Sequence, residues 1–254
     1  MSVSLSSTSV ALSNTSTTAA AQEDTTTAAL NKISPALGKA HGRVQSQLQS
    51  DSTSLSQLGK YKATVSDLSS AAQSLSQLGT GTASVADNAK VVERFVAAYN
   101  QAITASQPGT SSDASSTLAA SRRALTNANT DTSRSQLAKL GLSRQANGTL
   151  KLDAAALNKA LTASATSTSS SAGSALTTLA QLGKAIGKRA DSELTSTGRL
   201  ASATSLYSGK TSQLKQQQTR LLEAATQMSS QASTGIGTGT GNWSTQQALR
   251  KYSV

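Results

Sequence analysis

The stretch LAKLGLSRQANGTLKLDAAALNKAL, residues 137–161, is the most sharply patterned part of this 254-residue chain. Leu140 and Leu142 alternate with small or polar neighbours, and Leu150 and Leu152 do the same beyond the dipeptide Asn147-Gly148. Because Asn-Gly tolerates positive φ, this pattern predicts a β-hairpin with a type I′ turn. An isolated hairpin is only marginally stable, so this one must pack on something else.

A helix is expected directly after the hairpin. Asp153 is predicted to cap the N-terminus of this helix, DAAALNKAL, over residues 153–161. Leu157 and Leu161 follow at helical spacing and are expected to point back toward the leucines of the hairpin. In its simplest interpretation, the hairpin and the helix close a small core.

The surrounding composition favours long helices over a compact layered core. Only 36% of the residues are apolar and 2% are aromatic, whereas large side chains supply most of the buried area in a globular interior. The only two prolines, Pro35 and Pro108, leave long stretches free to be helical. We therefore expect helices packed side by side.

Two helices are predicted before the hairpin by apolar residues at three- and four-residue steps. The first spans about eight turns from residue 44 onward, and its stripe comprises Leu48, Leu55, Leu58, Tyr61, Val65, Leu68, Ala72, Leu75 and Leu78. The second covers residues 88–103, with Val92, Phe95, Val96, Tyr99 and Ile103 on one face. Residues 117–142 are expected to form one or two shorter helices that lead into the hairpin.

The longest periodic run covers residues 176–232. Its later part follows a heptad pattern, with seam positions Tyr207, Thr211, Leu214, Gln218, Leu221, Ala225, Met228 and Ala232. Gly183, Gly187, Gly198 and Gly209 each cost about 1 kcal/mol relative to alanine inside a helix. The upstream part of the run is therefore expected to bend or break.

These patterns give a fold class and three regions. We predict a mostly α protein, an antiparallel helical bundle or coiled coil of N- and C-terminal helices, with a small module of β-hairpin plus helix at 137–161. Residues 1–43 are rich in Ser, Thr and Ala and are expected to be disordered. Residues 44–232 form the helical domain, and residues 233–254 a glycine-rich flexible tail.

No catalytic, cofactor-binding or metal-binding residues are predicted. His41 is the only histidine, lies beside Gly42 without nearby acid pairs, and is interpreted as a surface residue. GKAIGKR, residues 183–189, is one residue too short for a phosphate loop and has Arg189 in place of Ser or Thr. Cysteine is absent. We therefore expect a protein that is not an enzyme, with no cofactor and no small-molecule substrate.

The charge balance is basic, with 23 Lys and Arg against 12 Asp and Glu. The positive charges are mostly spread singly and few aromatic residues are present to stack on bases, which disfavours nucleic acid as the partner. No window approaches about 18 consecutive apolar residues, so no membrane span is predicted. The N-terminus lacks the basic and apolar regions of a cleaved signal peptide.

Four stretches in order along the chain resemble the flagellar filament cap protein family, also called flagellar hook-associated protein 2. They are residues 55–78, 91–103, 137–161 and 198–228. The second stretch resembles the family's FVxxYN helix, here Phe95, Val96, Tyr99 and Asn100. In the third stretch the matching positions are Leu137, Leu140, Gly141, Leu142, Gly148, Leu150, Leu152, Asp153, Leu157, Ala160 and Leu161. The large variable head domains of the family are missing, because only residues 79–89 separate the first two stretches.

The resemblance implies a structural component of the bacterial flagellum. Such a protein would be exported through the flagellar type III channel without a cleaved signal peptide, and would act outside the cell. Its partners would be copies of itself and axial proteins such as flagellin or the hook–filament junction proteins. The helical seam expected to mediate this assembly comprises Leu55, Leu58, Val65, Leu68, Leu75, Tyr207, Leu214, Leu221 and Met228.

Two alternatives remain open at this point. One is a basic helical protein that binds nucleic acid or an anionic surface. The other is a type III secreted effector or adhesin that reuses the same scaffold.

Overall fold

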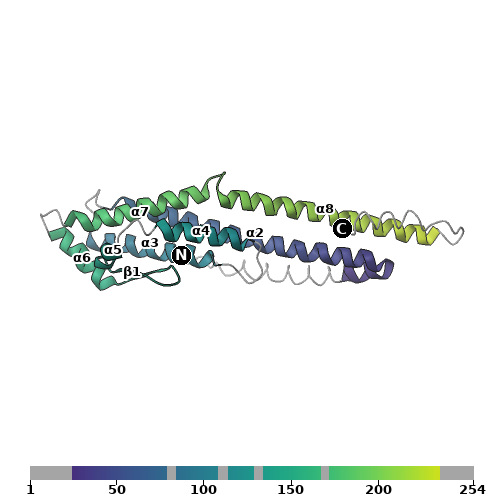
Figure 1. Ribbon diagram of the computed structural model, residues 1–254, viewed down its shortest axis with the longest axis horizontal. Helices are drawn as coiled ribbons and strands as arrows, with labels where there is room; N and C mark the ends of the chain where they lie inside the picture. Colours follow the sequence, from purple (N-terminus) through teal and green to yellow (C-terminus); the bar gives the residue numbers. More distant parts are fainter. Residues whose placement is uncertain (1–24, 79–83, 108–113, 129–133, 167–171, 235–254) are drawn as a thin grey trace, which may run out of the picture. The chain divides into compact units, whose positions relative to one another are not determined.

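The computed structural model describes residues 25–78, 84–107, 114–128, 134–166 and 172–234 (Figure 1). Residues 25–33 are helical, and the further elements in chain order are α2 (Pro35–Ser76), α3 (Val85–Ala105), α4 (Ser115–Ala128), α5 (Arg134–Lys139), β1 (Leu142–Arg144), β2 (Leu150–Leu152), α6 (Ala154–Thr166), α7 (Ala172–Leu194) and α8 (Arg199–Thr234). The described chain is mostly α with one small β-hairpin, and this confirms the predicted fold class.

The described helices begin earlier than the sequence predicts. Residues 25–33 and the first turns of α2 are helical, although the composition favoured disorder up to residue 43. The difference arises because Leu30 and Leu37 are both buried in one apolar cluster. An average over the composition of the segment does not detect such a local contact. The rest of the predicted disordered segment, residues 1–24, and nearly all of the predicted glycine-rich tail lie outside the described residues.

The chain divides into two compact units. Unit 1 comprises residues 1–51 and 209–254, of which 25–51 and 209–234 are described, and unit 2 comprises residues 52–208. The helices α2 and α8 each contribute one part to unit 1 and the other part to unit 2. Each unit has an apolar cluster of its own.

Unit 2 has an extensive apolar core. The stripe on α2 supplies Leu58, Tyr61, Val65, Leu68 and Leu75, all at most 1% exposed. The face of α3 supplies Val92, Phe95, Val96, Tyr99 and Ile103, as its spacing predicts. Leu179, Leu182 and Ile186 of α7 and Leu200 and Tyr207 of α8 join the same cluster. Both predicted apolar faces are therefore confirmed as core-forming.

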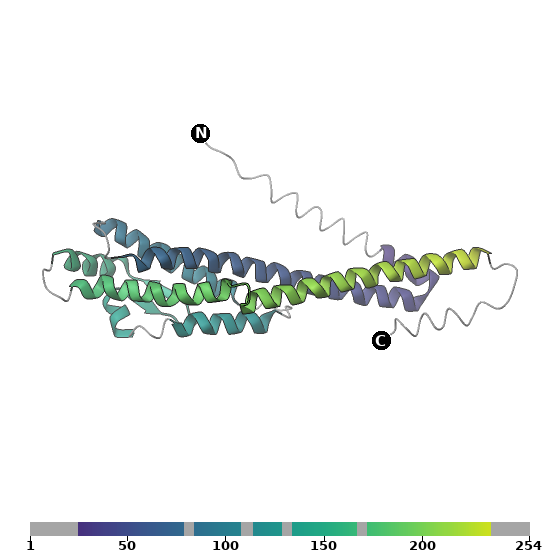
Figure 2. The ribbon, with the colours of Figure 1, turned by 90° about the horizontal axis from the view of Figure 1, so that it is seen from above.

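Within unit 2, the second half of α2 and the helix α7 run side by side (Figure 2). The Ser69 hydroxyl on α2 donates a hydrogen bond to Oδ1 of Asp191 on α7. A Cβ at Gly183 would lie only 2.7 Å from the carbonyl oxygen of Ala72, so glycine is required for this close approach. The helix α7 therefore continues through Gly183, and the expected break in the upstream part of the run occurs at residues 195–198, next to α8.

Unit 1 has a much smaller apolar cluster. Leu30, Leu37, Leu221 and Ala225 are buried in it, and Ala40, Val44, Ala224 and Met228 are half-buried against it. The buried and half-buried positions of α8 in this unit follow the predicted heptad seam, because Leu214, Gln218, Leu221, Ala225 and Met228 are all shielded.

The β-hairpin forms where it was predicted, but its turn differs. The strands are antiparallel and pair Leu142 with Leu152 and Arg144 with Leu150. The type I′ prediction is wrong, because among the described residues positive φ occurs only at Gly141 and Gly148. The N–H of Gly148 instead bonds the carbonyl of Gln145 at 3.0 Å, which closes a four-residue turn with glycine at its end. Asn147 accepts hydrogen bonds from Thr149 and needs no left-handed backbone.

Candidate functional site

The hairpin is held to unit 2 by one side chain of α3. The Asn100 amide donates from Nδ2 to the carbonyl of Leu150 at 2.8 Å and accepts at Oδ1 from the N–H of Leu150 at 2.7 Å. The strand register explains why these groups are available to Asn100. Arg144 and Leu150 form a non-hydrogen-bonded pair, so the N–H and the carbonyl of Leu150 point away from β1. Asn100 therefore satisfies the hydrogen-bonding groups of Leu150 at the outer edge of β2, as a third strand would.

The corner between the hairpin and α6 is equally specific. The N–H of Asp153 bonds the carbonyl of Gly141 at 2.7 Å, and its carboxylate accepts from the N–H of Ala156 at 3.0 Å. Gly141 has φ of +73°, and a Cβ there would lie 2.5 Å from the Asp153 carbonyl oxygen. The predicted helix cap is thus confirmed, and Leu157 and Leu161 are buried in the same core as Leu142 and Leu150.

A buried polar cluster joins three helices of unit 2. Glu193 at the end of α7 is 3% exposed. It accepts from the Ser121 hydroxyl of α4 at 2.8 Å and from the guanidinium of Arg199 of α8 at 2.6 Å. Burial, followed by the nearby Glu193 carboxylate, raises the pKa of the Tyr61 phenol above its ordinary value. The phenol therefore stays neutral at physiological pH.

The sequence reasoning missed this cluster, although a signal was present. Leu179, Leu182, Ile186, Ala190 and Glu193 follow one another at three- and four-residue steps, which places the carboxylate on the buried face of α7. Ser121 lies between Leu118 and Leu125 on the buried face of α4 in the same way. A polar residue inside an apolar stripe is the pattern that predicts such a contact.

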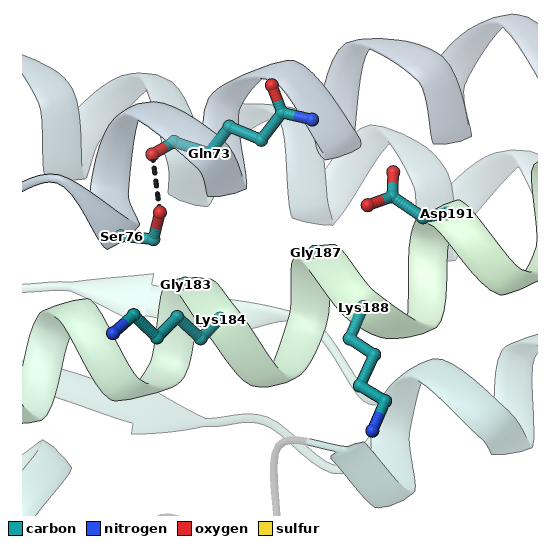
Figure 3. A pocket seen from close by; sticks show the side chains of 7 residues that line it. All are labelled: Gln73, Ser76, Gly183, Lys184, Gly187, Lys188 and Asp191. Carbon is teal, nitrogen blue, oxygen red and sulfur yellow. Dashed lines mark hydrogen bonds between the residues drawn. The ribbon is translucent and has the colours of Figure 1, made fainter.

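A shallow groove of about 310 Å³ lies between α2 and α7 in unit 2. It is lined by Gln73, Ser76, Gly183, Lys184, Gly187, Lys188 and Asp191 (Figure 3). Lys188 points away from α2, Lys184 extends along α7, and Asp191 is already bonded to Ser69 (Figure 3). The polar groups thus do not converge on a common point, and the arrangement is that of two closely packed helices.

The predicted seam residues are mostly used for packing within one chain. Leu58, Val65, Leu68, Leu75 and Tyr207 are buried in the core of unit 2, and Leu55 is half-buried against it. In unit 1, Leu221 is buried and Met228 is half-buried in the small cluster, and Leu214 is half-buried. Their role in assembly stays a prediction.

His41 is not the surface residue that the sequence predicted, because its side chain is fully buried in unit 1. Its Nδ1 lies 2.9 Å from the Thr27 hydroxyl, and its Nε2 lies 3.4 Å from the Gln218 amide nitrogen. The residue lies inside α2 and its imidazole faces α8. The imidazole therefore joins all three helical segments of this unit.

The described residues contain no cluster of three or more His, Cys, Asp and Glu side chains that could hold a metal ion. None of the described helices is long and apolar enough to cross a membrane. Comparisons with protein-family models, curated proteins and solved structures find no match to this chain. The class that the fold defines is a mostly α protein with a clamped β-hairpin.

Proposed function

We propose that this protein is a structural component of the bacterial flagellum, related to the filament cap proteins but without their head domains. It acts by associating with copies of itself and by docking on axial subunits. It is exported through the flagellar type III channel and works outside the cell. No catalytic step belongs to this function.

The observation that supports the proposal is the convergence of the family-like stretches in one core. Residues from 55–78, 91–103, 137–161 and the start of 198–228 all contribute to the unit 2 cluster. The two polar positions of the resemblance also have specific contacts, since Asn100 binds Leu150 and Asp153 caps α6. Residues of the four stretches thus pack in one core, as the proposal expects.

Localisation tests the proposal most directly. A tagged copy in its own bacterium should appear in the sheared flagellar fraction, and deletion of the flagellar export gate should abolish its export. The purified chain should form a defined assembly larger than a dimer by light scattering. A monomer that binds duplex DNA tightly at physiological salt would contradict the proposal and favour the nucleic-acid alternative.

The seam of α8 supplies a mutational test of the same proposal. Leu214→Asp together with Leu221→Asp places two charges on the shielded stripe and is expected to abolish assembly. The matched control is Leu206→Asp with Leu222→Asp, because both leucines lie on α8 and are exposed. If circular dichroism shows that the first pair of substitutions unfolds the chain, the assembly test is made with the single variant Leu214→Asp. Assembly that survives a folded Leu214→Asp variant would show that this seam does not join copies.

A further inference from the structure

The turn of the hairpin contains a chemically reactive dipeptide, Asn147-Gly148. An asparagine side chain can be attacked by the next backbone nitrogen, and glycine at that position has no Cβ to obstruct the attack. Asn147 is the one asparagine of this chain that precedes a glycine. The asparagine is exposed, whereas Gly148 is buried. The two reacting groups therefore differ in their access to water.

The side-chain amide of Asn147 is presented for attack. Its Oδ1 accepts hydrogen bonds from the N–H of Thr149 at 3.0 Å and from the hydroxyl of Thr149 at 2.7 Å. Negative charge develops on this oxygen when a nucleophile adds to Cγ, and donors already directed at it stabilise that charge. Because the side chain is exposed, a leaving ammonia molecule can depart into solvent. The structure therefore favours the electrophilic half of the reaction.

The backbone nitrogen of Gly148 is held back in the folded protein. Its N–H donates a hydrogen bond to the carbonyl of Gln145 at 3.0 Å, and it must lose this proton before it can attack. The residue also packs closely, because a Cβ built on it would lie 3.1 Å from Cγ2 of Thr126 on α4 and 3.8 Å from Cγ2 of Ile103 on α3. A buried, hydrogen-bonded amide reacts with hydroxide only when the structure around it opens. The fold therefore suppresses the nucleophilic half of the reaction.

The helix that covers Gly148 also holds the next strand. Asn100 of α3 binds both backbone groups of Leu150, two residues after Gly148, and Ile103 of the same helix lies against the glycine. Release of the two Asn100 hydrogen bonds would let β2 move away from α3. Such a movement would remove the cover of the Gly148 amide at the same time.

We propose that Asn147 is a deamidation site that stays unreactive while the hairpin is docked on α3 and becomes reactive when the hairpin detaches. Hydroxide removes the Gly148 amide proton, and the electron pair of this nitrogen forms a bond to Cγ of Asn147. The Cγ–Nδ2 bond then breaks, and ammonia leaves with a proton taken from water, which regenerates hydroxide. Water opens the resulting five-membered succinimide ring at either carbonyl and leaves aspartate or isoaspartate at position 147.

The isoaspartate product would hinder renewed docking of the hairpin. It adds one carbon atom to the main chain inside the four-residue turn that the Gly148 N–H closes. In a hairpin the length of the turn fixes the register of the strands, and here that register pairs Arg144 with Leu150. The modification therefore records that the hairpin has been released from α3. This inference does not depend on the proposed function.

The experiment measures the rate of deamidation at position 147 in the full chain at mildly alkaline pH. Trypsin cuts after Arg144 and Lys151, so Asn147 is followed in the peptide 145–151 by its change in mass. Chromatography separates the aspartate and isoaspartate forms of this peptide. The samples are the folded wild type, the wild type in denaturant, Asn100→Ala, and the matched control Gln101→Ala, whose side chain is exposed on α3.

The proposal expects the denatured wild type to react fastest and the folded wild type at least about tenfold more slowly. Asn100→Ala should react about tenfold faster than the folded wild type, because the hairpin opens more often, and Gln101→Ala should stay within about twofold of it. If circular dichroism shows that Asn100→Ala is unfolded, Asn100→Asp replaces it, since the carboxylate still accepts from the N–H of Leu150.

Three results would overturn the proposal. Equal rates in the folded and the denatured wild type would show that the fold does not protect the dipeptide. An unchanged rate in a folded Asn100 variant would show that docking on α3 does not control the reaction. Formation of aspartate without isoaspartate would exclude the succinimide, and with it the attack by the Gly148 nitrogen.

Discussion

Units 1 and 2 use parts of the same two helices, α2 and α8, but pack them very differently. In unit 2 the stripe of α2 consists of large residues such as Leu58, Tyr61 and Leu68, and these are at most 1% exposed. In unit 1 the same helix buries His41 and Asp51. The spacing of the shielded positions is similar in both. The comparison teaches that heptad spacing sets which face is covered, whereas side-chain size and polarity set how much stability the contact supplies.

The largest expected effect concerns the apolar anchors of the two units. Phe95→Ala should lower the free energy of unfolding of unit 2 by about 4 kcal/mol, because a fully buried ring leaves a cavity in a closed core. Leu221→Ala should cost unit 1 only about 2 kcal/mol, since its cluster is small and can collapse. Hydrogen exchange read by mass spectrometry measures each unit separately.

The matched control for both variants is Leu206→Ala, which truncates an exposed leucine on α8 and should cost less than about 0.5 kcal/mol. If Phe95→Ala and Leu221→Ala destabilise their units equally, the difference in packing between the units has no energetic consequence and the comparison fails.

The second effect tests the two hydrogen bonds by which Asn100 holds the hairpin in unit 2. Asn100→Ala removes both hydrogen bonds to Leu150 and leaves a shielded N–H and carbonyl unpaired, at a cost of about 3 kcal/mol. Gln101→Ala is the control, because the next residue of α3 is exposed. Exchange of the Leu150 amide should become much faster in Asn100→Ala and stay unchanged in Gln101→Ala. Equal protection in both variants would show that the hairpin is held by its leucines alone.

Much of unit 2 could be predicted from the sequence because its elements follow simple periodicities. The faces of α2 and α3, the hairpin and the Asp153 cap all follow from spacing and local chemistry. The type of turn did not, because Asn147 forms side-chain bonds with Thr149 instead of adopting positive φ. Local preference allows both solutions, and the packing of the hairpin selects between them.

The polar contacts between helices were not predictable in the same way. Ser69 with Asp191 and Ser121 with Glu193 join residues that are far apart in the chain. Spacing can place each side chain on a buried face, but it cannot identify the partner. In a core made largely of small and similar residues, such pairs can fix the relative register of the helices, because a shift of one turn would leave the buried polar groups unpaired. The burial of His41 in unit 1 was missed for a different reason, because residues 1–43 were expected to be disordered and their apolar positions were not used to define a buried face.

The third effect is a decrease in the unfolding free energy of unit 2 at alkaline pH. Burial and the Glu193 carboxylate raise the pKa of the Tyr61 phenol, so the folded unit holds this proton more strongly than the unfolded chain. The stabilisation is complete below pH about 10 and is lost as the pH rises above it, by up to about 1.4 kcal/mol per pH unit. Tyr61→Phe should make the unfolding free energy of unit 2 less dependent on pH in this range. An unchanged slope in a pH series of denaturant titrations would show that Tyr61 is not the responsible group.

The smallest effect is expected in unit 1 and has the opposite sign. Asp51 is fully buried, and neither of its carboxylate oxygens has a hydrogen-bond partner. Replacing an unpaired buried polar group by an apolar one of similar size removes a desolvation cost, so Asp51→Leu should stabilise unit 1 by about 1 kcal/mol. Asp67→Leu on the exposed face of the same helix is the control and should change little. Slower hydrogen exchange of unit 1 amides in Asp51→Leu, but not in Asp67→Leu, would show that the burial of the Asp51 carboxylate lowers the stability of unit 1. Destabilisation by Asp51→Leu would instead mean that the carboxylate makes a favourable interaction in solution, and the contrast between the units would then rest on the size of their apolar clusters alone.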